Sequence, residues 1–288
     1  MKLIVLILAV LALRYVQHGR SEKRYDWFVN YASRFSARLQ QARVNNSWLL
    51  TVIVLVPFLV GLAVVYALVG FWLFGFISFI MNLVLVWYCL WPLSNQQLEL
   101  EGFKSEEKET TEQSEVVIDE QGEVVSSKAQ SHSAYRSSSE NILAQANSNT
   151  FAVIFWFIVL CGFGALLYRM VALIAEDTRH EALAKLQPAA KLIQQVLDWV
   201  PARLLALAYV VAGDFLHGFN KWVQWLAKGL SASRDLLIAV GMSAMEVDVS
   251  DVSKADKEEV RNTIRMTDRA LIVWLVVVAI FTLGALIY

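Results

Sequence analysis

The sequence predicts an all-α protein, a polytopic helical membrane protein with interfacial or re-entrant amphipathic helices and a disordered acidic loop. Three observations support this fold class. Residues 44–98 contain no charged side chain and no histidine. The 288-residue chain is 57% hydrophobic, and its mean hydropathy of +0.49 is high for a soluble domain. Several of its ten tryptophans stand near the ends of apolar segments, where the membrane interface favours them.

Residues 44–93 are predicted to form a transmembrane hairpin. A bilayer crossing needs about 20 apolar residues in a helix, and this stretch is long enough for two. Backbone amides in lipid must be paired within the segment, so both crossings should be helices. Gly70 and Gly75 bracket the expected turn.

The N-terminal region, residues 1–43, divides into two parts. Residues 1–13 are apolar behind a single Lys2, and we interpret them as a buried or partly inserted helix that is retained. Residues 14–43 are basic and amphipathic, which is typical of a helix at an anionic membrane surface. Their excess of Lys and Arg predicts a cytoplasmic location. Their aromatic and apolar residues recur at helical spacing: Trp27, Phe28, Tyr31, Phe35 and Leu39.

Residues 94–139 form the expected acidic, serine-rich loop. Between residues 99 and 123 there are ten acidic residues and two lysines. Such a composition buries too little apolar surface to offset the entropy of ordering. A small hairpin over residues 116–125, with Gly122 in its turn, is the alternative, but an isolated hairpin is marginally stable.

Residues 140–247 are predicted to hold the third crossing and several amphipathic or re-entrant helices. Ser137 and Glu140 have capping-box spacing, so a helix should start there and continue through residues 151–168. Gly162 and Gly164 permit close helix contact, either within the protein or with a partner helix.

A helix is expected over residues 180–200, with Pro201 marking a helix start or a break because proline cannot donate a backbone hydrogen bond. Residues 199–212 are interpreted as a short crossing or a re-entrant element. Residues 215–230 are amphipathic. The last region, 248–288, should hold a charged helix followed by a transmembrane helix over residues 270–288.

Signatures of soluble enzymes are largely missing. The string from Gly213 to Lys221 has Phe219 and Asn220 where a phosphate-binding loop requires Lys and Ser or Thr. The four histidines are scattered without metal-ligand spacing. The net charge of −1 does not indicate the basic surface that a nucleic-acid-binding protein needs. We therefore expect no catalytic residue, no metal site, no cofactor and no nucleic-acid partner.

The candidate binding residues are polar side chains beside the apolar runs, since an ionisable group at membrane depth is costly and marks a functional site by default. The set is Tyr168, Arg169, Asp177, Asp198 and Arg203. A structural explanation remains open for three of them. Asp198 would cap a helix start, while Arg169 and Arg203 would extend to the membrane interface.

Three strings resemble the AmpE family: FAVIFWFIVLCGFGALLYRM, VLDWVPARLLALAYVVAGD and VWLVVVAIFTLGALIY. This resemblance implies a bacterial inner-membrane, multi-pass protein that is associated with AmpD and with β-lactamase regulation. The AmpE family is in turn similar to the adenosylcobinamide-phosphate synthases CobD/CbiB, membrane enzymes that use ATP and a divalent metal. Tyr168, Arg169 and the run 201–204 match the synthase pattern.

The acidic positions of that pattern are absent. Ala172 and Ala175 stand where the synthases have Asn and Asp, and Gln194 and Gln195 stand where they have an Asp pair. Because Mg²⁺ prefers carboxylate oxygens, the resemblance implies loss of the metal-dependent reaction. The arginines that can hold a phosphate group remain.

Three hypotheses follow. The first is an AmpE-type signalling modulator that binds an anionic ligand or a membrane partner near Arg169, Asp198 and Arg203. The second is an ATP-dependent amide-forming enzyme of the synthase type. The third is a protein that seats the helix of a single-span membrane partner, using glycines such as Gly61 and Gly162. In each case the lipid bilayer is the main environment of the chain.

Overall fold

The computed structural model describes Val5, Ala9 and residues 25–41, 46–72, 76–90, 136–177, 180–245 and 252–287. Every regular element in these ranges is a helix, which confirms the all-α prediction. The acidic loop before residue 136, the hairpin predicted at 116–125 and the turn at residues 73–75 lie outside the described residues.

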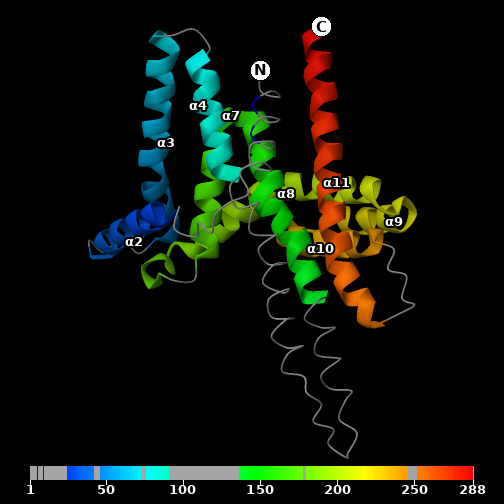
Figure 1. Ribbon diagram of the computed structural model, residues 1–288. Helices are drawn as coiled ribbons and strands as arrows, with labels where there is room; N and C mark the ends of the chain where they lie inside the picture. Colours follow the sequence, from blue (N-terminus) through cyan, green and yellow to red (C-terminus); the bar gives the residue numbers. More distant parts are fainter. Residues whose placement is uncertain are drawn as a thin grey trace, which may run out of the picture.

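The two helices expected within residues 44–93 are present as α3 (Ser47–Trp72) and α4 (Phe76–Leu90), and Gly70 lies inside α3. The described part of α4 has 15 residues, fewer than a full crossing needs, so the second crossing of the hairpin stays a prediction. Figure 1 shows α3, α4 and the C-terminal part of α11 (Val252–Ile287) extending in the same direction. Among the described helices, three stretches are long and apolar enough to cross a membrane: Ser47–Ala67, Arg136–Glu176 and Gln187–Ala212. The length and apolar composition of these helices indicate a membrane protein.

The third apolar run belongs to a helix that is present from Arg136 onward, as the Ser137–Glu140 spacing predicted. This helix contains a π-helical turn, Asn147–Phe151, and continues as α7 (Ala152–Glu176). Helix α7 packs against α4 and α8. Its buried residues Phe157, Ala165 and Tyr168 form one core with Val86 and Leu90 of α4.

Helix α7 is interrupted at Cys161, whose φ of 57° and ψ of −152° are not helical. The freed N–H of Gly162 donates to Asn82 Oδ1 of α4 at 3.1 Å. Tyr66 of α3 donates its hydroxyl to the same oxygen at 2.7 Å. The hairpin thus supplies the acceptor that the interrupted helix lacks, and the sequence offered only Gly162 and Gly164 as a sign of this contact.

Helix α8 (Gln187–Ala212) corrects two expectations. It begins at Gln187 rather than His180, because Pro188 occupies its first turn, where a missing N–H costs nothing. Pro201 lies inside the helix and neither starts nor breaks it. The carbonyl of Leu197, four residues before this proline, accepts a hydrogen bond from the indole Nε1 of Trp156 at 3.1 Å. An α7 side chain therefore replaces the bond that proline cannot make.

Two short helices follow α8. Helix α9 (Phe215–Leu226) ends four residues before the predicted boundary, and α10 (Ser233–Ala244) was not predicted. The apolar side chains of α10 recur at helical spacing and are buried with α8: Leu236, Leu237, Val240 and Ala244. Figure 1 shows α8, α9 and α10 lying across the direction of α3 and α11.

Helix α2 (Asp26–Gln41) is amphipathic as predicted, but its aromatic face meets protein. Phe28 is buried, and the rings of Phe28 and Tyr31 lie 5.3 and 4.9 Å from Phe58 of α3. Trp27 is more exposed than the other aromatic residues of this helix. Helix α3 therefore covers part of the aromatic face of α2, and the location of this helix at the membrane surface stays a prediction.

Candidate functional site

The centre of the candidate site is a polar cluster formed by Asp198, Tyr168 and Asn147. The Oδ1 atom of Asp198 accepts a hydrogen bond from the Tyr168 hydroxyl at 2.6 Å and from Asn147 Nδ2 at 2.8 Å. Tyr168 is completely buried, and Asn147 is nearly so. The cluster thus joins α8, α7 and the π-helical turn through one carboxylate oxygen.

Local structure explains why these side chains meet. Asp198 directly follows Leu197, whose carbonyl is held by Trp156 because Pro201 cannot donate to it. Trp156 and Tyr168 both belong to α7, so the same helix fixes the backbone beside Asp198 and binds its side chain. Asn147 opens the π-helical turn, a local widening of the helix that often occurs at functional sites.

One polar atom of the cluster lacks a hydrogen-bond partner among the described residues. The Oδ1 atom of Asn147 is buried and has no hydrogen-bond partner within the described part of the chain. A buried polar atom without a partner is costly and calls for a structural or functional reason. The cluster therefore combines two strong donors to Asp198 with one acceptor that remains available.

Arg169 follows Tyr168 but enters a different environment. It is buried, and its guanidinium lies 5.1 Å from the ring centre of Tyr25. The Tyr25 hydroxyl donates to the carbonyl of Tyr88 at 2.5 Å, and burial raises the pKa of Tyr25, so this phenol stays neutral. The Nε of Arg169 has no hydrogen-bond partner among the described residues. Arg169 is thus a buried cation whose Nε donor is unpaired within the part of the chain that the structure describes.

Arg203 has a structural role, because its guanidinium links α8 to the end of α9. Its Nε and Nη2 donate to the carbonyls of Leu226 and Lys228 at 3.1 and 2.6 Å, just at the end of α9. Its Nη1 donates to the carbonyl of Trp199 at 2.9 Å, and the guanidinium stacks on the Trp199 ring. All three guanidinium nitrogens therefore donate to backbone carbonyls, and Arg203 pairs carbonyl groups that would otherwise be left without a partner at the C-terminal end of α9.

Asp177 lies at the connection between α7 and α8. Its carboxylate is 3.0 Å from Nδ1 of His180, and its carbonyl accepts from the Gln187 side chain at the start of α8. The neighbouring Glu176 accepts from Gln194 Nε2 at 3.1 Å. Gln194, one of the two glutamines at the place of the synthase carboxylates, thus also links α7 to α8.

Of the five predicted site residues, the structure brings Tyr168 and Asp198 into direct contact. Arg169, Asp177 and Arg203 each have partners outside this contact. Sequence reasoning missed Asn147 and Trp156. For Asn147 the available signal was its place in the polar string of residues 145–150, directly before the third apolar run. Within the described ranges, His, Cys, Asp and Glu form no group of three that could hold a metal ion.

Comparison with known proteins identifies the family. The family described as "Regulatory signalling modulator protein AmpE" matches residues 1–287. The chain belongs to the AmpE family. This confirms the resemblance drawn from the three sequence strings, and the AmpE match spans the helices that form the polar cluster.

Curated relatives of this AmpE-family chain include two proteins named "Cobalamin biosynthesis protein CobD". The one from Chromobacterium violaceum is 29% identical over 116 residues, which are 40% of this chain and 37% of the relative. The one from Stutzerimonas stutzeri is 29% identical over 114 residues, 39% and 38% of the two chains. The match thus spans well under half the length of each relative. No solved structure matches the chain.

Proposed function

We propose that this protein is an inner-membrane, multi-pass signalling modulator that acts in the regulation of β-lactamase. Membership in a family of regulatory modulators supports the general role. Helices long and apolar enough to cross a membrane support the location. The finer assignment to β-lactamase regulation follows the resemblance to the AmpE family.

The observation that most supports a specific site is the hydrogen bonding of Tyr168 and Asn147 to Asp198. A signalling protein needs an element whose two arrangements differ in free energy by a modest amount. The contact between α7 and α8 fits this need, because it depends on one carboxylate oxygen, an interrupted α7 and a proline-containing α8. Breaking or shifting these bonds changes how the two helices pack.

An anionic ligand that acts at this site would meet Arg169 rather than Arg203. The Nε of Arg169 is free of partners in the described part of the structure, whereas the Arg203 nitrogens bind carbonyls. A planar guanidinium suits carboxylate and phosphate oxygens. A single-span partner helix is the alternative occupant in our proposal, and it would contact the exposed valines of α3 around Gly61.

The role is tested by deleting the gene in a Gram-negative host with inducible β-lactamase and restoring it on a plasmid. We expect deletion to change induction by a β-lactam and the wild-type chain to restore it. Arg169→Gln at equal membrane abundance should restore it poorly. Unchanged induction after deletion would refute the proposed role.

The partial similarity to CobD proteins favours a second candidate, an ATP-dependent amide-forming enzyme. Gln194 stands at the position of a synthase carboxylate and donates a hydrogen bond from its amide to Glu176. An uncharged amide is a weaker ligand for Mg²⁺ than a carboxylate. The purified protein is therefore expected to show no Mg²⁺-dependent ATP turnover. Turnover above that of an empty-membrane preparation would favour the enzyme over the modulator.

A further inference from the structure

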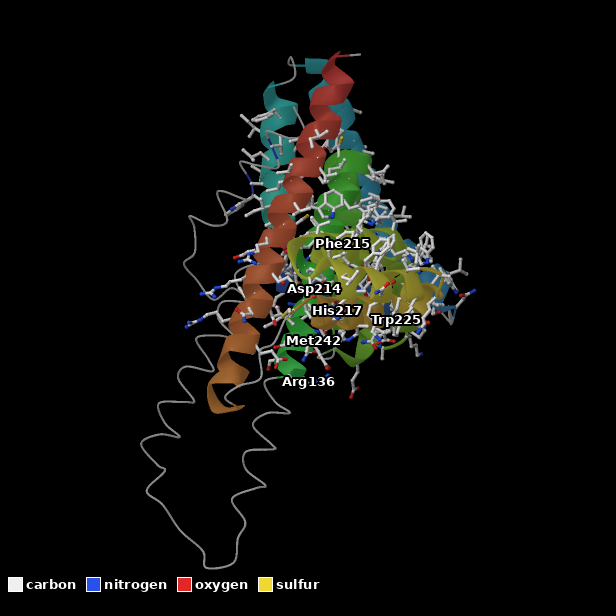
Figure 2. The ribbon with its side chains drawn as sticks, turned by 90° about the vertical axis from the view of Figure 1, so that its right-hand side faces the viewer. Arg136, Asp214, Phe215, His217, Trp225 and Met242 are labelled. Carbon is white, nitrogen blue, oxygen red and sulfur yellow. The ribbon has the colours of Figure 1, made fainter. Side chains whose placement is uncertain are left out.

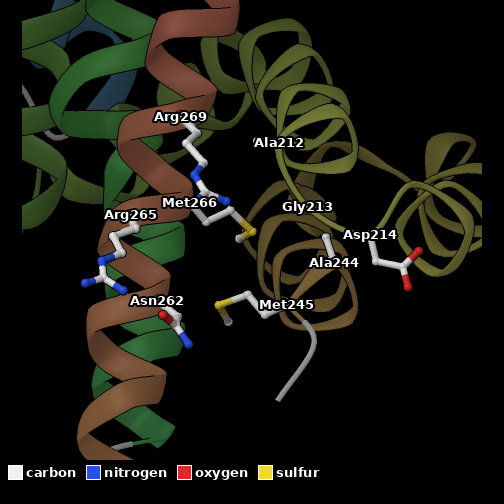
Figure 3. Close-up of a pocket in the computed structure, with 9 residues that line it drawn as sticks. All are labelled: Ala212, Gly213, Asp214, Ala244, Met245, Asn262, Arg265, Met266 and Arg269. Carbon is white, nitrogen blue, oxygen red and sulfur yellow. The ribbon is translucent and has the colours of Figure 1, made fainter. Parts of the chain in front are cut away.

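A pocket of about 430 Å³ lies where the end of α8, the end of α10 and the middle of α11 meet. Arg265, Arg269 and Asn262 of α11 line one side of it, and Met245 lies opposite (Figure 3). Both arginines are exposed, and within the described residues neither makes a hydrogen bond or an ion pair. These cations therefore remain available to a ligand.

Asp214 is the one carboxylate among the described residues that line this pocket, and it does not neutralise the two arginines. Figure 3 shows the Asp214 side chain pointing away from Arg265 and Arg269. Asp214 instead caps α9, accepting from the backbone N–H of Leu216 at 2.8 Å and of His217 at 3.2 Å. A hydrogen bond from the His217 side chain lowers the pKa of Asp214, so this carboxylate stays charged and committed to α9. Counted over the described lining residues, the pocket therefore has a net positive charge.

Helix α9 indicates where the pocket lies relative to a membrane. Its exposed apolar residues form one stripe about 100° wide: Phe215, Leu216, Phe219, Val223 and Leu226. Phe215 and Leu216 are 57% and 69% exposed, which is unusual for large apolar side chains in contact with water alone. On another side of the helix, Trp222 and Trp225 pack against the core. A helix with an apolar face open and a polar face beside it typically lies in the plane of the membrane interface.

The orientation of the stripe agrees with the long helices. Figure 2 shows Phe215 on the side of α9 toward which α3, α4 and the end of α11 extend, and His217 on the other side. Arg269 is the last charged residue before the apolar end of the chain. Asp214, at the start of α9, lines the same pocket as Arg269. With α9 in the interface plane, the pocket would lie at the depth where lipid headgroups meet water.

We propose that this pocket binds the phosphate group of an anionic phospholipid through Arg265 and Arg269, with Asn262 as a further donor and α9 resting in the same leaflet. Arginine binds phosphate oxygens through two parallel N–H groups, which favours a phosphodiester. An anion that is part of a lipid also places acyl chains beside the apolar stripe of α9, whereas a free phosphate gains only the charge contacts. The proposal does not depend on the polar cluster at Asp198.

The test uses the full chain in detergent and native mass spectrometry with three probes: short-chain phosphatidylglycerol, short-chain phosphatidylcholine and glycerol phosphate. We expect the wild type to bind phosphatidylglycerol more tightly than either other probe. A juxtamembrane arginine contributes about a fivefold change in binding to an anionic lipid, so the double variant Arg265→Gln with Arg269→Gln should bind about 25-fold more weakly.

Arg261→Gln is the matched control, because Arg261 is exposed on α11 one turn before Arg265 and does not line the pocket. It should bind phosphatidylglycerol as the wild type does, and helix content by circular dichroism should be equal in all variants. Equal binding by the double variant would overturn the site. So would an equal loss in Arg261→Gln, which would indicate diffuse attraction. Glycerol phosphate bound as tightly as the lipid would overturn the lipid assignment in favour of a free phosphate.

Discussion

Gly162→Leu is expected to lower the free energy of unfolding by about 3 kcal/mol or more, which would reduce the amount of folded protein in the membrane. A Cβ atom at this position would lie 2.7 Å from the Tyr66 hydroxyl and 2.8 Å from Leu85 Cδ1. It would also lie 3.1 Å from Asn82 Oδ1, the acceptor for the Gly162 N–H. The added leucine must therefore displace the side chains of Tyr66, Leu85 and Asn82, which breaks the bonds to Asn82 Oδ1 that compensate for the interruption at Cys161.

Gly61→Leu on α3 is the matched control, since a Cβ there meets no atom within 4 Å. The two variants add the same side chain to long apolar helices, so only the site of contact differs. Thermal unfolding in detergent, followed by circular dichroism, should show a large loss for Gly162→Leu and a stability close to wild type for Gly61→Leu. Similar stability of both variants would mean that α7 does not approach the hairpin as closely as described.

Asp198→Ala is expected to destabilise the protein by about 2–4 kcal/mol. The change removes the acceptor for two buried donors, the Tyr168 hydroxyl and Asn147 Nδ2. Asn147 would then have neither polar atom paired among the described residues, since its Oδ1 already lacks a partner. Each unpaired buried donor costs about 1–3 kcal/mol.

A double-mutant cycle with Tyr168→Phe checks this assignment. In the Tyr168→Phe background, Asp198→Ala leaves only Asn147 Nδ2 without its acceptor. The substitution should therefore lower the free energy of unfolding by less than it does in the wild type. Gln195→Ala, a partly buried neighbour on α8, serves as the control for loss of a polar side chain. Strictly additive effects would show that Asp198 and Tyr168 do not interact.

Much of this fold follows from the sequence because lipid imposes simple rules. Uncharged runs predicted the α3–α4 hairpin, and the Ser137–Glu140 spacing predicted the helix that leads into α7. Helix α10 was missed because its short apolar pattern lies between stronger signals. The continuity of α8 was missed because the rule that proline breaks a helix assumes that the freed carbonyl stays unpaired, and Trp156 pairs it from another helix.

The site was predictable only in part, because contacts between helices far apart in the sequence decide which of its residues meet. Ionisable residues next to apolar runs are few, so Tyr168 and Asp198 stood out from the sequence. Which residues meet depends on how α7 and α8 pack. That packing brings Asn147 to Asp198 across 51 positions of sequence and takes Arg203 to the end of α9. Residue type indicated the chemistry, whereas long-range contact decided the partners.

The most direct test of the central claim is the β-lactamase response of Asp198→Asn at wild-type membrane abundance. An asparagine keeps the shape and one acceptor oxygen for Tyr168 and Asn147 but removes the charge, so the protein should still fold. If the polar cluster transmits the signal, the response should fall about fivefold or more, the usual size of a coupling between sites. A normal response from a normally folded Asp198→Asn protein would contradict the claim.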